Sequence, residues 1–192
     1  MTDDARKSAS GRLQITLIAL VFGVPFLLAA WLYYDESLQP SGRTNHGSLL
    51  APIVNLHEAV PDSLAVELSD DHWLLVYAND GECDAQCRDA LYALRQSRLM
   101  LGNDMRRLTR VFLHGEFAPD RVFIEAQHPG LRVLQDRSLG DLLASSRPDP
   151  LPSGGYFLVD PLGNLVMYFP PDIVPGDMVD DIEHLLDVSR IG

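Results

Sequence analysis

One uninterrupted apolar stretch near the N-terminus constrains this chain more than any other feature. Residues 13–34 read LQITLIALVFGVPFLLAAWLYY and contain no charged side chain. About 20 apolar residues in a helix span the hydrocarbon core of a bilayer, and such helices tolerate glycine and proline of the kind found at Gly23 and Pro25. The last residues are aromatic, which suits the headgroup layer of a membrane. The stretch therefore predicts a single transmembrane helix over residues 13–34.

The charges on either side of this stretch predict its orientation. Basic residues precede it and acidic residues follow it directly, namely Arg6, Lys7 and Arg12, then Asp35 and Glu36. Because cytoplasmic flanks carry the excess of lysine and arginine, residues 1–12 are expected in the cytoplasm and the remainder outside it. In a Gram-negative cell this places the protein in the inner membrane with a periplasmic domain. A cleaved signal peptide is the alternative, but the run is long for one, and bulky aromatic residues follow Ala29-Ala30.

The composition predicts an acidic globular domain beyond the anchor. The chain has 192 residues, 46% of them hydrophobic, which is enough for one domain with its own core. It carries 27 acidic against 15 basic residues, a formal net charge of −12. No nucleic-acid partner is expected, because binding a phosphate backbone needs a basic footprint. The acidic surface is expected to be solvated, and a face for a cationic partner is the alternative.

Strand-like and helix-like segments alternate along the rest of the chain. Residues 35–60 are polar and punctuated by proline and glycine, and they predict a stalk and entry segment before a domain at residues 61–192. Within that domain the patterns predict strands at 72–78, 108–114 and 131–134, helices at 84–101, 119–127 and 177–189, and a hairpin of 156–160 with 165–169. Alternation of this kind predicts an α/β fold with a mixed sheet and flanking helices.

The only two cysteines lie where an α/β fold carries its chemistry. Cys83 and Cys87 follow the first predicted strand and open the first predicted helix, with Asp84 as its expected N-cap. Cysteines at positions i and i+4 of a helix face the same side. Such a pair can cycle between dithiol and disulfide, bind Cu(I), or close a structural disulfide, and all three interpretations stay open. The helix N-terminus favours a thiolate, whereas Asp84 and Glu82 oppose one.

Histidines are the candidates for a third metal ligand beside the cysteines. His114 ends the second predicted strand and comes near the pair if the first two strands are neighbours, so Cys83, Cys87 and His114 form the predicted metal site. His46 and His57 lie in the entry segment and are alternatives if that segment folds over the site. The paired carboxylates at Asp70-Asp71 and Asp180-Asp181 are predicted to be solvated surface charges.

Three segments resemble the thioredoxin superfamily and, within it, the membrane-anchored Sco/SenC proteins of cytochrome c oxidase assembly. They are the entry motif Asn45–Leu50 (NHGSLL), the pair Cys83–Cys87 (CDAQC) and the hairpin Phe157–Asn164 (FLVDPLGN). The hairpin motif is widespread in thioredoxin-like proteins, whereas the four-residue cysteine offset together with an N-terminal anchor is more specific. The resemblance implies a thioredoxin-like mixed sheet with flanking helices, preceded by the transmembrane helix.

The resemblance also implies a function. A membrane-anchored assembly factor for cytochrome c oxidase is expected, acting by thiol–disulfide exchange at Cys83 and Cys87, with oxidase subunits or copper chaperones as partners. A Cu(I) carrier that uses the pair as ligands and a non-catalytic scaffold stapled by a structural disulfide are the alternatives. In Sco-type proteins a histidine shortly before the hairpin completes the copper site, and residues 152–156 contain none here. The resemblance therefore carries over the two cysteines but not a third ligand.

Overall fold

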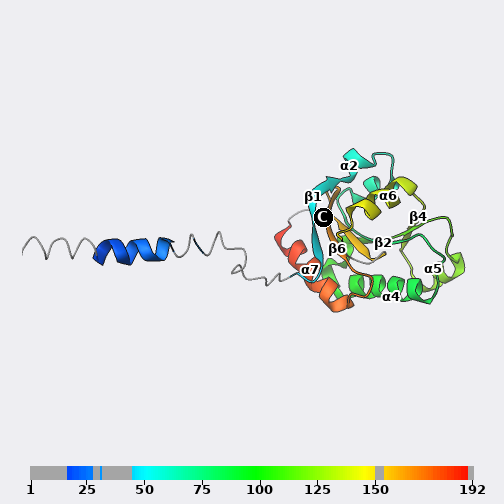
Figure 1. Ribbon diagram of the computed structural model, residues 1–192. Helices are drawn as coiled ribbons and strands as arrows, with labels where there is room; N and C mark the ends of the chain where they lie inside the picture. Colours follow the sequence, from blue (N-terminus) through cyan, green and yellow to red (C-terminus); the bar gives the residue numbers. More distant parts are fainter. Residues whose placement is uncertain (1–16, 28–30, 32–44, 150–153, 190–192) are drawn as a thin grey trace, which may run out of the picture. The chain divides into compact units, whose positions relative to one another are not determined.

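The computed structural model describes residues 17–27, 31, 45–149 and 154–189, which fall into two compact units, residues 1–44 and Asn45–Gly192 (Figure 1). In the first unit, residues 17–27 are helical. Across the described residues, no helix has both the length and the apolar character needed to cross a membrane. The other parts of the predicted span 13–34, apart from Trp31, lie outside the described residues, as do residues 1–12 and 35–44.

The second unit is built on a six-stranded mixed sheet with the strand order β1-β6-β5-β2-β3-β4. Strands β2, β3 and β4 pair in parallel, and β1, β6, β5 and β2 pair antiparallel. The strands are β1 (Ser48–Asn55), β2 (Trp73–Asn79), β3 (Leu108–His114), β4 (Arg132–Leu134), β5 (Tyr156–Val159) and β6 (Asn164–Phe169). The predicted mixed α/β sheet is confirmed.

Helices cover both faces of this sheet. Figure 1 shows α4 and α7 on one side and α2 and α6 on the other. The helical segments are α2 (Leu56–Ala59), α3 (Leu64–Ser69), α4 (Ala85–Met100), the 3₁₀ segment η1 (Gly102–Arg106), α5 (Arg121–Gln127), α6 (Arg137–Ser146) and α7 (Pro175–Val188). Two separate clusters of buried apolar side chains result, one on each face of the sheet.

Strand β2 is apolar along its length because it is central and covered on both faces. Trp73, Leu75 and Tyr77 enter the cluster under α4 and α7, while Leu74 and Val76 enter the opposite cluster. This alternation follows from the two-residue period of a strand. The loop after β2 follows the carboxyl end of this central strand.

The predicted hairpin is confirmed, and a local hydrogen-bond network forms its turn. The Asp160 carboxylate accepts the backbone N–H groups of Leu162 and Asn164 at 2.9 and 2.8 Å. Gly163 adopts φ +79°, a left-handed conformation that favours glycine. The turn joins β5 to β6, and β5 pairs directly with β2.

Five elements were not predicted from the sequence, namely β1, α2, α3, η1 and α6, and two of them are long enough to shape the domain. Residues 48–55 of the expected entry segment form the edge strand β1, which pairs with β6, and the compact unit accordingly begins at Asn45 rather than at residue 61. Only Leu50 is buried in β1, so the strand has no alternating apolar pattern. Residues 137–146 form α6, which Asp136 caps by accepting the Leu139 N–H at 3.1 Å.

Candidate functional site

The cysteine pair lies in the loop that joins the carboxyl end of β2 to the start of α4. The Asn79 side chain ends the strand by donating to the Gly81 carbonyl at 3.1 Å. Helix α4 then begins at Ala85, and the Asp84 carboxylate accepts the Cys87 N–H at 3.1 Å. Asp84 is thus the helix N-cap, as predicted, and this bond fixes the backbone of Cys87 in the first helical turn.

Cys83 and Cys87 form a disulfide with a Cα–Cα distance of 5.0 Å. The two residues differ in their exposure to solvent. Cys87 is 2% exposed and belongs to the buried cluster beneath α4, whereas Cys83 is only partly buried and packs against that cluster. An attacking thiolate from solvent or from a partner protein therefore has access to the Cys83 side of the disulfide.

Two buried tyrosines support the inner side of the pair. The rings of Tyr77 and Tyr156 lie 5.3 Å apart, and the Tyr156 hydroxyl donates to the Ala90 carbonyl in α4 at 3.1 Å. Burial, followed by the charge of Asp84, raises the pKa of Tyr77 to about 12. Burial and the neighbouring Tyr77 also raise the pKa of Tyr156. Both phenols are therefore neutral packing groups at physiological pH rather than acid–base catalysts.

A hollow of about 590 Å³ opens beside Cys87, and it is called the Cys87 hollow below. Its walls are the loop after β2, helix α6 and the segment at Gly154, with Phe157 and Pro171. Its charged lining residues are three carboxylates and one guanidinium, from Asp80, Glu82, Asp84 and Arg147. The environment of the buried cysteine is therefore acidic on balance.

A second hollow of about 370 Å³ lies beside Cys83 and is called the Cys83 hollow. It is lined by Glu82, Cys83 and the segment 116–120, which follows β3. The two loops meet because β2 and β3 are parallel neighbours, so that their carboxyl ends emerge together, and Gly115 packs closely on the backbone of Asp80. Phe117 is 49% exposed in this hollow.

His114 is near the pair but does not face it. It pairs in register with Asn79 at the end of β3, is buried, and has its Nδ1 2.9 Å from the Gly115 carbonyl oxygen. It lines a third hollow with Ala118, Pro119 and Ile124, and Ala118 and Pro119 also line the Cys83 hollow. Strands β2 and β3 are neighbours, which is the condition on which His114 was expected near the pair, but His114 and Cys83 line different hollows.

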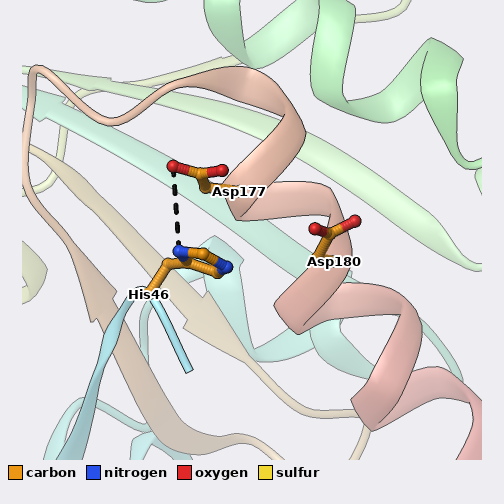
Figure 2. Close-up of side chains that lie close together, drawn as sticks. All are labelled: His46, Asp177 and Asp180. Atoms are coloured by element: carbon orange, nitrogen blue, oxygen red, sulfur yellow. Dashed lines mark ion pairs between the residues drawn. The ribbon is translucent and has the colours of Figure 1, made fainter. Parts of the chain in front are cut away.

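The described residues contain one group of three metal-donor side chains with ligand atoms within 4.8 Å of one another, and it is not the predicted set. It consists of His46, Asp177 and Asp180, whereas Cys83, Cys87 and His114 form no such group. Figure 2 shows the His46 ring beside Asp177 and Asp180 on α7, with His46 Nδ1 3.7 Å from an Asp177 carboxylate oxygen. His46 therefore does not fold over the cysteines.

The other entry-segment histidine is also away from the pair. His57 lies in α2 at the turn between β5 and β6, where the preceding Leu56 N–H donates to the Gly163 carbonyl at 2.8 Å. The turn follows Val159, the last residue of β5, and Val159 pairs with Leu74 near the start of β2. The cysteines, in contrast, follow the end of β2. His57 thus lies at the opposite end of the central strands from the cysteine pair.

One carboxylate expected at the surface is buried, which corrects a prediction. Asp181 is 6% exposed and accepts the backbone N–H groups of Gly47 at 2.7 Å and His46 at 3.1 Å. The helical period of α7 gives a signal for this burial, because Asp181 lies three residues after the buried Met178, on the same face of the helix. Asp180 is exposed, as predicted.

Comparisons with known proteins agree on the fold. A family model described as "Transmembrane-like, thioredoxin-like, C-terminal domain" matches residues 73–189, more than half of the chain. A comparison with curated protein sequences finds no match.

Solved structures of Sco proteins share the fold at low sequence identity. The apo Sco1 protein from Thermus thermophilus aligns with a TM-score of 0.55 at 19% identity, covering 76% of this chain and 99% of that one. Yeast Sco1 with copper bound aligns with a TM-score of 0.52 at 16% identity, covering 65% and 81%. Arabidopsis thaliana ScoI with copper bound aligns at 0.51 and 17% identity, covering 65% and 89%. At these identities the likeness demonstrates a common fold.

Proposed function

Because the chain belongs to the transmembrane-like, thioredoxin-like C-terminal domain family, we propose that it is a membrane-anchored thiol–disulfide exchange protein. Cys83 and Cys87 are the reacting residues in this proposal. The observation that carries it is the asymmetry of the pair, in which a partly exposed Cys83 is bonded to a buried Cys87 at the capped start of α4. A disulfide that only staples a fold needs no accessible sulfur, whereas exchange with another protein does.

The exchange runs through a mixed disulfide. In the reduced protein the Cys83 thiolate attacks one sulfur of a partner disulfide, an S–S bond forms between the two proteins, and one partner thiolate leaves. The Cys87 thiolate then attacks the Cys83 sulfur, closes the Cys83–Cys87 bond and releases the second partner thiolate. Two electrons pass to the partner, and the two protons of the Cys83 and Cys87 thiols end on the two partner thiols. A dithiol protein of lower potential regenerates the reduced pair.

The charges around the pair favour this direction of electron flow. The Asp80, Glu82 and Asp84 carboxylates line the Cys87 hollow, and negative charge destabilises a neighbouring thiolate. Dithiol proteins that are strong oxidants have a stabilised reduced form. An environment that destabilises the reduced, thiolate form therefore favours a reductant. The partial positive charge at the N-terminus of α4 has the opposite effect and stabilises a thiolate. The Asp84 carboxylate that caps this helix end offsets it.

The proposed setting is the assembly of cytochrome c oxidase. The support is the resemblance of the sequence motifs to Sco/SenC proteins together with the shared fold. In this proposal residues 13–34 anchor the chain in the inner membrane, the domain lies in the periplasm, and the partners are oxidase subunits or copper chaperones. The pair would keep their copper-site cysteines reduced and able to accept metal.

Cu(I) transfer is the second candidate function, and structures of yeast and Arabidopsis proteins with this fold hold copper. The residues described here do not fit a three-donor copper site, because the two sulfurs are bonded to each other and His114 is not gathered with them. Anaerobic titration of the reduced chain with Cu(I) against a competing chelator tests this candidate. One-to-one binding that is lost in Cys83→Ser/Cys87→Ser and weakened in His114→Ala would establish it.

The exchange function is tested by equilibrating the full chain in thiol–disulfide buffers and measuring the reduced fraction by alkylation. We expect a potential between about −200 and −300 mV, the range of biological dithiols. In addition, Cys87→Ser should accumulate a mixed disulfide with an added model disulfide, while the matched Cys83→Ser should not, because its remaining thiol is buried. A potential far below about −300 mV with no mixed disulfide would instead identify a structural disulfide in a scaffold protein.

A further inference from the structure

Negative charge surrounds the accessible side of the disulfide. Glutamate and aspartate side chains line both hollows that flank the pair, namely Asp80, Glu82, Asp84, Glu116 and Asp120. These five residues are exposed. Among the described lining residues of the two hollows, the one cationic side chain is Arg147, in the Cys87 hollow. We call these five residues the acidic rim.

Helix capping gives a structural role to only two of the five carboxylates in the acidic rim. Asp84 and Asp120 cap α4 and α5 by accepting backbone N–H groups. The side-chain carboxylates of Asp80, Glu82 and Glu116 accept no hydrogen bond in the described part of the chain, although the Glu82 backbone carbonyl accepts the Asp84 N–H at 2.9 Å. The ion pairs among the described residues are His46–Asp177 and Arg107–Asp104, so no rim carboxylate is neutralised by a bonded cation.

The cations nearest to the rim along the chain, Arg88 and Arg121, line neither hollow beside the disulfide. Arg88 is one residue past Cys87, and its guanidinium stacks over the Phe123 ring at 5.1 Å from the ring centre. Arg121 lines the hollow of His114 rather than either hollow beside the disulfide. The potential that a partner meets at Cys83 is therefore dominated by carboxylates.

The Cys83 hollow also offers an apolar contact. Phe117 is half exposed between Glu116 and the Ala118-Pro119 turn, in the same hollow as Cys83. An extended peptide that presents its cysteine to Cys83 would place neighbouring side chains against this ring and against the carboxylates of Glu82 and Glu116. Aromatic side chains are enriched at the cores of protein interfaces, and the rims of such interfaces are polar.

We propose that the exchange partner presents a cysteine flanked by lysine or arginine side chains, and that the acidic rim selects it. This inference rests on the proposed exchange function and names its substrate class, a cationic cysteine-bearing protein segment. Complementary charge raises the rate of encounter by about 10- to 1,000-fold at low ionic strength, and salt screens it over about 8–10 Å. Glutathione, which is anionic, is a poor substrate on this account.

The test compares two synthetic disulfide peptides of the same length, one with lysines and one with glutamates beside its cysteines. The reduced full chain is mixed with each peptide and its oxidation is followed by rapid-quench alkylation. We expect the lysine peptide to react at least about tenfold faster at low salt, with the ratio falling towards one at about 0.5 M salt. Glu82→Gln/Glu116→Gln removes two of the five rim carboxylates and should reduce this preference. The matched control Glu58→Gln/Glu67→Gln, which changes two exposed carboxylates in α2 and α3 that line neither hollow, should keep it.

The outcomes separate the two proposals. Equal, salt-independent rates for both peptides would overturn the acidic-rim inference and leave thiol exchange standing. A preference that is as large in Glu82→Gln/Glu116→Gln as in the parent chain would likewise overturn it. If neither peptide oxidises the pair, the exchange function fails and this inference fails with it.

Discussion

The Asp181 carboxylate accepts the backbone N–H of Gly47 at 2.7 Å and thereby joins the first residues of the domain to its last helix. The same carboxylate accepts the N–H of His46 at 3.1 Å. Gly47 lies so close to the Phe169 ring that a Cβ atom at this position would overlap it. The segment before β1 is therefore fixed by two contacts, hydrogen bonds to the buried Asp181 carboxylate on α7 and packing of Gly47 against Phe169 on β6.

Replacing Asp181 tests this connection. Asp181→Ala leaves two N–H donors without their acceptor, and we expect the free energy of unfolding to fall by about 2–4 kcal/mol, since hydrogen bonds to charged groups contribute about 1.5–3 kcal/mol each. Urea denaturation followed by circular dichroism measures the change. The neighbouring Asp180→Ala is the matched control and should stay within about 0.5 kcal/mol of the parent, because Asp180 is exposed. Equal effects of the two substitutions would refute the structural role of Asp181.

Asp84 should tune the cysteine pair as well as cap α4. Asp84→Asn keeps a capping oxygen but removes the charge, so we expect the reduced form to be stabilised and the reduction potential to rise by roughly 10–30 mV. The pH at which Cys83 becomes half-reactive towards iodoacetamide should fall in the same variant. Asp136→Asn, the equivalent change at the N-cap of α6, is the control for a general effect of lost charge, because Asp136 lines neither hollow beside the disulfide. An unchanged potential in Asp84→Asn would mean that Asp84 acts only as a cap.

The segment before β5 has no room for a side chain at residue 155. Gly155 adopts φ +99°, and a Cβ atom there would lie 2.5 Å from the Phe169 carbonyl oxygen. Gly155→Ala should therefore destabilise the protein by about 2–4 kcal/mol, combining backbone strain with overlap. Gly154→Ala is the matched control, because Gly154 has φ +83° but open space around it, and it should lose only the smaller strain contribution. Thermal unfolding distinguishes them, and equal losses would show that overlap at residue 155 is unimportant.

The pH dependence of stability should contain a contribution from Asp136. Burial raises the pKa of this carboxyl, but hydrogen bonds with Ser138, Ser63 and the backbone of Leu139 outweigh burial and leave the pKa below its usual value of about 3.9. A lowered folded-state pKa gives stability that is present above pH 4 and is lost as the pH falls through the folded value. Asp136→Asn should therefore be less stable than the parent at pH 7, with the difference shrinking below about pH 4. A gap that is constant with pH would exclude this charge effect.

The local elements of this domain could be predicted because their signals are local. The unbroken apolar run of β2, the hairpin with Gly163 in its turn and the Asp84 cap of α4 all follow from preferences over a few residues. The cysteines were assigned to the right loop for the same reason. Thioredoxin-like topology followed from the order of these elements together with the sequence resemblance.

The sequence alone thus determined strands β2 to β6, helices α4, α5 and α7, the position of the cysteine pair and the overall acidic charge, because composition, periodicity and capping act between near neighbours. Only the tertiary structure decided what surrounds the pair. The parallel pairing of β2 with β3 brings segment 116–120 beside Cys83 and directs His114 into another hollow. The pairing of β1 with β6 places His46 over α7 and buries Asp181. These contacts join residues far apart in the chain, and they are set by strand register and helix packing, which no short window of sequence contains.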